Sequence, residues 1–313
     1  MKARFAAVAA AVLGFAPVTA SAQGIDLPCG NCRTAFQALT SAAPQFGIVA
    51  AAGNPVPGVE GTRGITLGLI PRTTATLRVA AGSVHLADLQ STDSEESLTP
   101  IAVKLGTATR VSEGSAAGTG ALDLLLEGGV LTNTGEGGRT SVILGVGARL
   151  GLLRESFTTP GVALSGMYRY VGRMQYGSGC TAQGCTMDGR ARFGLNDFSA
   201  RLTAGKRVGP VGLAAGAGWD RFSTRDGFYS YSFVTYVNGT PAGIATGSGE
   251  VDVRDTRWSA FVNLSRGLTI GSLVAEGGWM TGGHAVSDYD PGPGGYDPEQ
   301  GTFFGSLALR LQL

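Results

Sequence analysis

The sequence has few charged residues and no concentration of charge of one sign. Asp, Glu, Lys and Arg make up 15% of its 313 residues, and 24 basic against 23 acidic side chains leave a formal net charge of +1. Binding of nucleic acid requires a concentrated basic surface, so we expect no nucleic-acid partner. The low charge and a slightly positive mean hydropathy also exclude a disordered chain and a helix-rich protein with a charged surface.

Long apolar runs are missing beyond the N-terminal region. No later segment offers about eighteen consecutive apolar residues, so no later transmembrane helix is expected. At the start, Lys2 and Arg4 precede the run FAAVAAAVLGFAPV, and small residues stand at Ala20 and Ala22. This pattern predicts a signal peptide over residues 1–22 that is cleaved after Ala22. The alternative is a membrane anchor, which the shortness of the run disfavours.

Cysteine is scarce, and the four cysteines form two close pairs in the sequence. In an exported protein, the pair Cys29 and Cys32 and the pair Cys180 and Cys185 are expected to close local disulfides. The alternative for CGNC is a redox motif like that of thioredoxin. No strand and helix of the required pattern surround it, so we favour a structural disulfide.

Histidine is scarcer still, with two residues in the chain. His85 follows Ser83, and His284 precedes Asp288, but neither histidine has a nucleophile at a recognised spacing. We therefore expect that the protein is not an enzyme. A lipid-modifying enzyme of the membrane is the less favoured alternative.

Glycine, by contrast, is abundant at 51 residues, which disfavours long helices. Many segments alternate apolar and polar residues with the period of a β-strand. In 161–176, Tyr168 falls on one side of this pattern and Arg169 on the other, and in 302–313 leucines alternate with polar residues to the last position. The candidate strands, about twelve in number, are 45–53, 63–70, 74–86, 98–106, 120–132, 140–152, 161–176, 190–206, 210–223, 250–266, 270–283 and 302–313.

These strands predict an all-β fold, a transmembrane antiparallel β-barrel over residues 45–313. Its strand number is expected to be about twelve, within a range of roughly ten to fourteen, because most segments are long enough to cross a bilayer when tilted. Short turns alternate with long polar loops, as in outer-membrane barrels. The preceding segment, 23–44, is expected to be periplasmic, and a short helix under or inside the barrel is one conformation for it. A soluble exported sandwich or solenoid also alternates, but such a fold would bury a face rich in arginine.

The last strand, GSLALRLQL, resembles the final strand of outer-membrane β-barrel proteins of Gram-negative bacteria, although it ends in Leu313 where that family usually has an aromatic residue. The resemblance covers about residues 45–313. It implies a location in the cell outer membrane, a lipid environment and recognition by the barrel insertion machinery. It names a class of proteins and no particular activity.

The polar face of the strands is basic on balance. An inward basic lining concentrates anions, so we expect a narrow channel for passive passage of small polar or anionic solutes. The alternative is that the charges pair across the lumen and plug it, which gives a closed structural or adhesive barrel. The expected lumen-lining residues are Arg78, Lys104, Asp123, Glu127, Arg149, Arg169, Arg173, Arg201, Arg257, Glu276 and Arg310.

Aromatic residues near strand ends are expected to lie at the two membrane interfaces. They are Tyr168, Tyr170, Tyr176, Trp219, Trp258 and Trp279.

The long loops are acidic, and an acidic rim could hold divalent cations shared with lipopolysaccharide, but we favour a solvated acidic loop. Asp288 and Asp290 stand two residues apart before a glycine-rich stretch, but the prolines and the missing bidentate Glu depart from an EF-hand. We therefore expect no metal site and no cofactor. The expected partners are outer-membrane lipid, lipopolysaccharide, the insertion machinery and small solutes.

Overall fold

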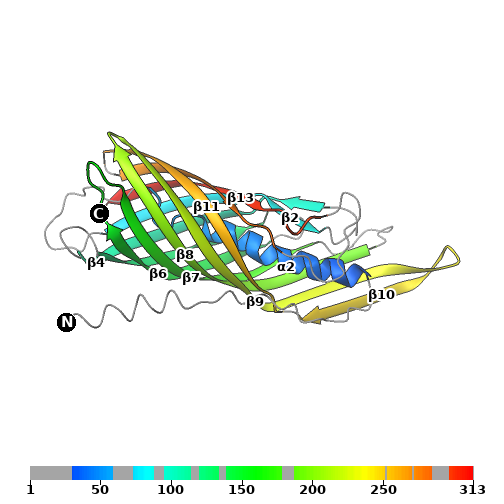
Figure 1. Cartoon of the computed structure of the whole chain (residues 1–313). Helices are drawn as coiled ribbons and strands as arrows, with labels where there is room; N and C mark the ends of the chain where they lie inside the picture. The colour runs from blue at the N-terminus through cyan, green and yellow to red at the C-terminus, as the bar shows by residue number, and fades with distance from the viewer. Residues whose placement is uncertain are drawn as a thin grey trace.

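The computed structural model describes residues 30–58, 73–87, 95–113, 120–133, 139–177, 187–250, 252–269, 271–283 and 296–312. Their strands form a closed antiparallel barrel around a helix (Figure 1). Around the barrel the strands are β1 (Thr73–Gly82), β4 (Ile101–Ser112), β5 (Leu122–Thr132), β6 (Thr140–Leu153), β7 (Gly161–Tyr176), β8 (Met187–Val208), β9 (Val211–Val237), β11 (Arg254–Gly267), β12 (Gly271–Met280) and β13 (Thr302–Gln312).

The barrel therefore has ten strands, and the predicted fold is confirmed at the lower limit of the predicted strand number. Closure is made by β1 and β13, which pair from Thr74 opposite Gln312 to Gly82 opposite Phe304. This pairing leaves no open edge in a medium where unpaired backbone groups are costly.

Two strand predictions do not match strands of the barrel. Residues 45–53 were predicted as a strand and instead form the end of helix α2 (Gly30–Ala51) and the bend after it, so the boundary predicted at residue 45 falls within one helix. The stretch GIVAAA has no polar side chain, so it shows neither the period of a strand nor that of a helix. It is therefore compatible with a helix buried on all faces as well as with a buried strand. The predicted strand 63–70 lies outside the described residues.

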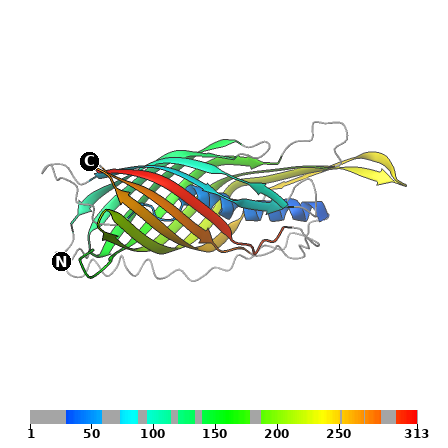
Figure 2. The same cartoon turned by 90° about the horizontal axis from the view of Figure 1, so that it is seen from above.

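The remaining strands form two projections at one end of the barrel. Ser83 interrupts the predicted strand 74–86, so that β2 (Val84–Ala87) leaves the wall and pairs with β3 (Glu95–Leu98). The end of β9 rises beyond the wall and pairs with β10 (Thr240–Glu250) (Figure 2). We call this end the loop end.

At the opposite end, the turn end, β8 and β9 are joined by Gly209 and Pro210 alone. Gly209 has a φ of +60°, which glycine adopts without the steric cost that a side chain brings. The long β9–β10 hairpin at one end and the tight β8–β9 turn at the other fit the predicted asymmetry.

The outer face of the barrel is apolar and exposed. On β11, Trp258, Val262 and Leu264 are 63%, 57% and 56% exposed, whereas Ser259 and Asn263 between them point inward and are buried. Water would not tolerate so continuous an apolar surface on every strand, but a bilayer solvates it. The chain is therefore a transmembrane β-barrel. Among the described residues, no helix is long and apolar enough to cross a membrane.

The predicted interface aromatics divide by orientation. Tyr168, Tyr170, Trp258 and Trp279 are exposed on the outer face, and Trp219 is half-buried there. Tyr176 was predicted at the interface but is buried inside the barrel, and this prediction is wrong. A bulge between Val171 and Met174 shifts the alternation of β7, so that every residue after it changes face.

A charge placed on the outer face should destabilise the barrel more, the closer the charge lies to the middle of the bilayer. We expect Val262→Arg, near the middle of β11, to lower the free energy of unfolding by about 2–4 kcal/mol because the charge meets hydrocarbon. The matched control Thr256→Arg, on the same face nearer the loop end, should cost about 0–1 kcal/mol. Urea unfolding in lipid vesicles, followed by heat-modifiable gel migration, measures both. Equal costs for the two variants would contradict a bilayer centred on the middle of β11.

Candidate functional site: the plugged lumen

Helix α2 occupies the lumen and carries the chain through the barrel. Its N-terminal end lies at the loop end and its C-terminal end lies between the strands (Figures 1 and 2). Residues 52–58 continue towards the turn end, where the Gly58 amide donates to Asn263 Oδ1 at 3.2 Å. We call residues 30–58 the plug. Residues 30–44 belong to the segment predicted as periplasmic, for which a short helix under or inside the barrel was one conformation, and in the structure they are helical and part of the plug.

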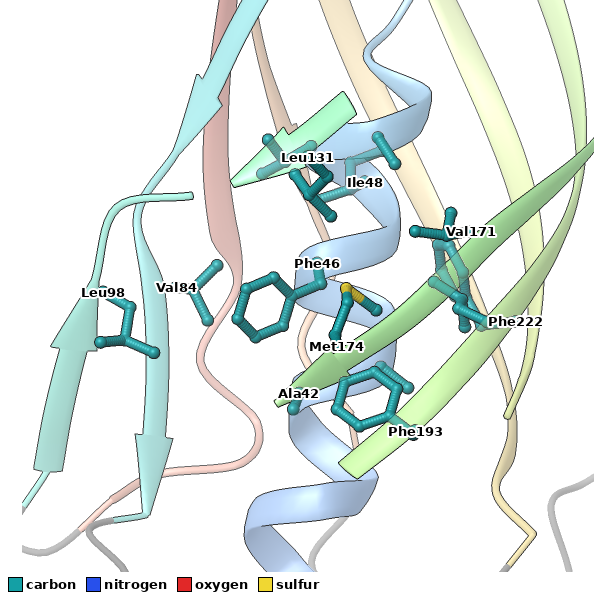
Figure 3. Close-up of a cluster of buried hydrophobic side chains, with 14 of the residues drawn as sticks. Ala42, Phe46, Ile48, Val84, Leu98, Leu131, Val171, Met174, Phe193 and Phe222 are labelled. Atoms are coloured by element: carbon teal, nitrogen blue, oxygen red, sulfur yellow. The ribbon is translucent and has the colours of Figure 1, made fainter. Parts of the chain in front are cut away.

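The half of the lumen near the loop end is filled by apolar side chains (Figure 3). Phe46 of the helix packs edge-to-face against Phe193 of β8, with ring centroids 6.2 Å apart. Met174, Tyr176 and Phe222 belong to the same buried cluster. The bulge of β7 supplies two of these side chains, because it turns Met174 and Tyr176 inward.

The C-terminal end of the helix is bound by cations of the wall. Lys104 Nζ donates hydrogen bonds to the carbonyl oxygens of Ala50 and, at 3.1 Å, Ala51. Arg201 donates to Gly53 O at 3.0 Å and to Ala52 O at 3.3 Å. These carbonyls have no partner within a helix and carry the negative end of its dipole, so buried cations stabilise them.

Arg78 and Glu276 hold the next peptide groups. Arg78 donates to Asn54 O at 2.5 Å. Glu276 Oε1 accepts from the Gly53 amide at 2.9 Å, and Glu276 Oε2 accepts from the Asn54 amide at 2.8 Å. Glycine is required at position 53, because a Cβ there would lie 2.6 Å from Phe261 Cγ. The bend after the helix is thus fixed by charged side chains on both its donors and its acceptors.

The remaining lumen charges pair with one another. Arg169 donates to Glu127 at 2.6 Å and to Asp197 at 3.0 Å. Arg201 also donates to Asp220 at 2.6 Å. Asp197 and Asp220 are fully buried, and neither was among the predicted lumen residues. Alternation could have located Asp220, since Trp219 and Arg221 flank it on the outer face.

The structure places all but one of the predicted lumen residues inside the barrel. Arg173 lies outside, with its side chain 74% exposed and 3.3 Å from Asp226, because the bulge of β7 reverses its orientation. Its inward placement was therefore wrong. Whether the others line a pore stays a prediction. The inward residues are Arg78, Lys104, Asp123, Glu127, Arg149, Arg169, Arg201, Arg257, Glu276 and Arg310.

A small cavity lies beside the described part of the plug. A cavity next to Pro55 and Val56 has a volume of about 20 Å³. This is room for about one water molecule and none for a hydrated solute.

The predicted disulfides and one histidine cannot be placed. Cys29, Cys180, Cys185 and His284 lie outside the described residues, and Cys32 is in α2. The signal peptide and the Asp288–Asp290 stretch lie outside them as well.

The other histidine, His85, lies on the β2–β3 hairpin at the loop end. Its Nε2 is 2.7 Å from Ser83 Oγ, and its Nδ1 is 3.3 Å from Ser97 Oγ. Nucleophilic catalysis uses a serine and a base within this distance, although a short hydrogen bond between residues two apart on a strand is also a common structural contact.

Comparison with known proteins identifies no family for this chain. No protein-family model matches the sequence, and no curated protein matches it. The translocator domain of the autotransporter NalP from Neisseria meningitidis is 12% identical over 79% of this chain and 89% of that chain, with a TM-score of 0.37. The outer membrane protease OmpT from Escherichia coli is 11% identical over 81% of this chain and 100% of that chain, with a TM-score of 0.39. The membrane location follows from the apolar outer face of this chain, independently of these likenesses.

Loss of the Glu276 carboxylate should loosen the plug. Glu276→Gln preserves the size of the side chain but replaces one acceptor oxygen by a donor, which leaves one of the two backbone amides of the bend unpaired. We expect the free energy of unfolding to fall by about 1.5–3 kcal/mol. Urea unfolding measures the change. Ser306→Ala, which removes only a 3.3 Å hydrogen bond to the same carboxylate, is the control and should cost less. Equal stability of Glu276→Gln and wild type would show that the carboxylate does not hold the bend.

Proposed function

We propose that the protein is a closed outer-membrane barrel, plugged by its own N-terminal segment, that presents its hairpins at the cell surface. The observation that supports this most is the capture of residues 50–54 by Lys104, Arg78, Arg201 and Glu276. A plug that only filled space would not engage four charged wall residues. In barrels of this class the longer loops are extracellular, which orients the loop end outward.

The pairing of the lumen cations argues against steady anion passage through the plugged barrel. An anion-selective lining requires cations that face water. Lys104, Arg78 and Arg201 instead donate to carbonyls of the plug, and Arg169 is neutralised by two carboxylates. A solute that binds these cations would first have to break their hydrogen bonds to the plug or their ion pairs with wall carboxylates.

The surface that the closed barrel presents is the β9–β10 hairpin. It projects beyond the wall, and Val237 and Ile244 on it are 61% and 73% exposed. Serine, glycine and tyrosine dominate its sequence, FYSYSFVTYVNGTPAGIATGSG, a composition that suits adaptable protein contacts. An adhesive or assembly role fits this surface.

A second candidate is a channel that opens when the plug withdraws. In the described residues the plug is held to the wall by packing and hydrogen bonds, so its withdrawal would break no covalent bond. Lys104, Arg78 and Arg201 would then face water and would favour anions. The two candidates differ in whether the plug leaves the lumen.

Planar-bilayer conductance separates the two candidates. We expect the wild-type protein to give no steady conductance and a variant lacking residues 30–58 to conduct with anion preference, since its lumen cations lose their partners. The second variant locks the plug. A Cβ at Gly82 would lie 2.6 Å from Val49 Cγ2, so Val49→Cys with Gly82→Cys, in a background without native cysteines, places two thiols within reach.

The locked variant decides the outcome if the deletion fails to fold. Steady wild-type conductance that persists in the oxidised, locked form would contradict the closed barrel. Conductance that disappears on oxidation and returns on reduction would support the channel with a moving plug. Heat-modifiable migration confirms that each variant is folded before it is measured.

We further propose that the protein is not an enzyme, and the Ser83–His85 contact provides the test. His85→Ala should leave any lipid hydrolysis by the purified protein at the level of the wild type, which we expect to be the background rate. Release of fatty acid from phospholipid vesicles measures the rate. Hydrolysis by the wild type that falls at least about a hundredfold in the variant, as loss of a general base predicts, would show that the hairpin is catalytic.

A further inference from the structure

The outer face of the barrel carries several arginines near the loop end. Alternation turns these side chains away from the lumen, since Asp197, Asp220 and Phe222 beside them point inward and are buried. They lie on neighbouring strands β7, β8, β9 and β11. The outward arginines are Arg173, Arg190, Arg192, Arg221, Arg225 and Arg254.

An aromatic belt lies directly below these arginines, on the side of the turn end. Trp219 of β9 is paired with Trp258 of β11, and Phe198 packs edge-to-face on Trp219 at 6.2 Å. Arg221 is two residues beyond Trp219, and Arg254 is four residues before Trp258. These spacings put the Cα atoms of the two arginines roughly 7–14 Å beyond those of the tryptophans along the strands. Aromatic belts mark the membrane interface, so the arginines lie at the level of lipid headgroups.

Arg221 and Arg254 line a depression of about 460 Å³, together with Asn196, Ser223, Thr224 and Asp252. The strand register builds it, because Ser223 pairs with Asn196 on one side and with Arg254 on the other. Two guanidinium groups against the single carboxylate of Asp252 leave its described lining positive.

Several polar groups of the depression have no protein partner. Within the described part of the chain, the side chains of Arg221 and Arg254 make no hydrogen bond and no ion pair. Asn196 Oδ1 is buried and also has no hydrogen-bond partner there. Buried polar atoms are normally satisfied, so an unpaired one beside two free cations points to a ligand.

The neighbouring arginine is held in place rather than free. The Arg225 guanidinium lies 3.9 Å from the centroid of the Tyr170 ring and donates to Val171 O at 2.9 Å. It thus forms a fixed positive wall beside the depression.

We propose that Arg221 and Arg254, with Asn196, bind the phosphate groups of a phosphorylated lipid of the outer leaflet. A guanidinium group binds phosphate through two parallel hydrogen bonds. The apolar surface below, with Trp219 and Trp258, would receive the acyl chains of the same molecule. This continuity between cations and an apolar belt favours a lipid over free phosphate. Lipopolysaccharide has this chemistry, and the contact differs from the acidic loops, which could share divalent cations with it.

The test compares binding of three probes to the full-length protein in detergent. The probes are lipopolysaccharide, lipopolysaccharide from which the lipid phosphates have been removed, and inorganic phosphate, each measured by native mass spectrometry and thermal shift. The variant Arg221→Ala with Arg254→Ala removes both cations. The matched control is Arg266→Ala, because Arg266 is exposed on the same face of β11 as Arg254, at the opposite end of the apolar surface.

We expect the double variant to bind lipopolysaccharide at least about tenfold more weakly, since each lost phosphate contact is a charged hydrogen bond. The Arg266→Ala control should bind as the wild type does, and the dephosphorylated probe should bind weakly to every form. Arg254→Ala alone, at an exposed strand end, gives the same direction of change if the double variant folds poorly. Wild-type affinity in both arginine variants, equal affinity for the dephosphorylated probe, or binding of inorganic phosphate alone would overturn the proposal.

Discussion

The constraint on which the rest of the structure depends is that a backbone amide or carbonyl without a partner is too costly in hydrocarbon. On the lipid side, the constraint is met by closure: β1 pairs with β13, and each strand of the wall has neighbours on both sides. The alternation of the strands follows from the same closure, because one face of every strand then meets lipid and the other meets the lumen. Leu307 and Leu309 are exposed outward for this reason, while Ala308 and Arg310 are buried inside.

The same constraint acts inside the barrel, where it determines how the lumen charges are used. A helix that ends within a protein leaves its last carbonyls without partners. The carbonyl groups of Ala50 to Asn54 have this problem. The wall solves it with three donors, Lys104, Arg201 and Arg78. Glu276 performs the converse task for the amides of Gly53 and Asn54. Four of the inward charges that look like a pore lining in the sequence thus hold the end of a helix and the bend after it.

The wall could be predicted from the sequence, and its contents could not. Period-two alternation located the ten wall strands, because lipid and lumen impose opposite requirements on successive residues of β7 or β11. Alternation fails where the register slips, and the bulge of β7 therefore exchanged the faces of Arg173 and Tyr176. It also fails for residues 45–53, since an apolar helix inside a barrel has no polar face to reveal its period. The partners of Lys104 and Glu276 are more than fifty residues away along the chain, and no local pattern encodes that contact.

Arginine has different roles on the two faces of the barrel wall, because the two faces differ in the hydrogen-bond acceptors within reach of the side chain. On β7 and β8, Arg169 and Arg201 point inward and find carboxylates within 3.0 Å. Arg221 and Arg254 point outward, where a transmembrane wall has few protein acceptors and the nearest anions are lipid phosphates. Burying an uncompensated cation is costly, so the inner arginines had to be neutralised by the protein itself. The outer arginines sit at the edge of the bilayer, where water solvates them until an anion arrives. A cation on this barrel is therefore free to recognise a ligand only outside the lumen while the plug is in place.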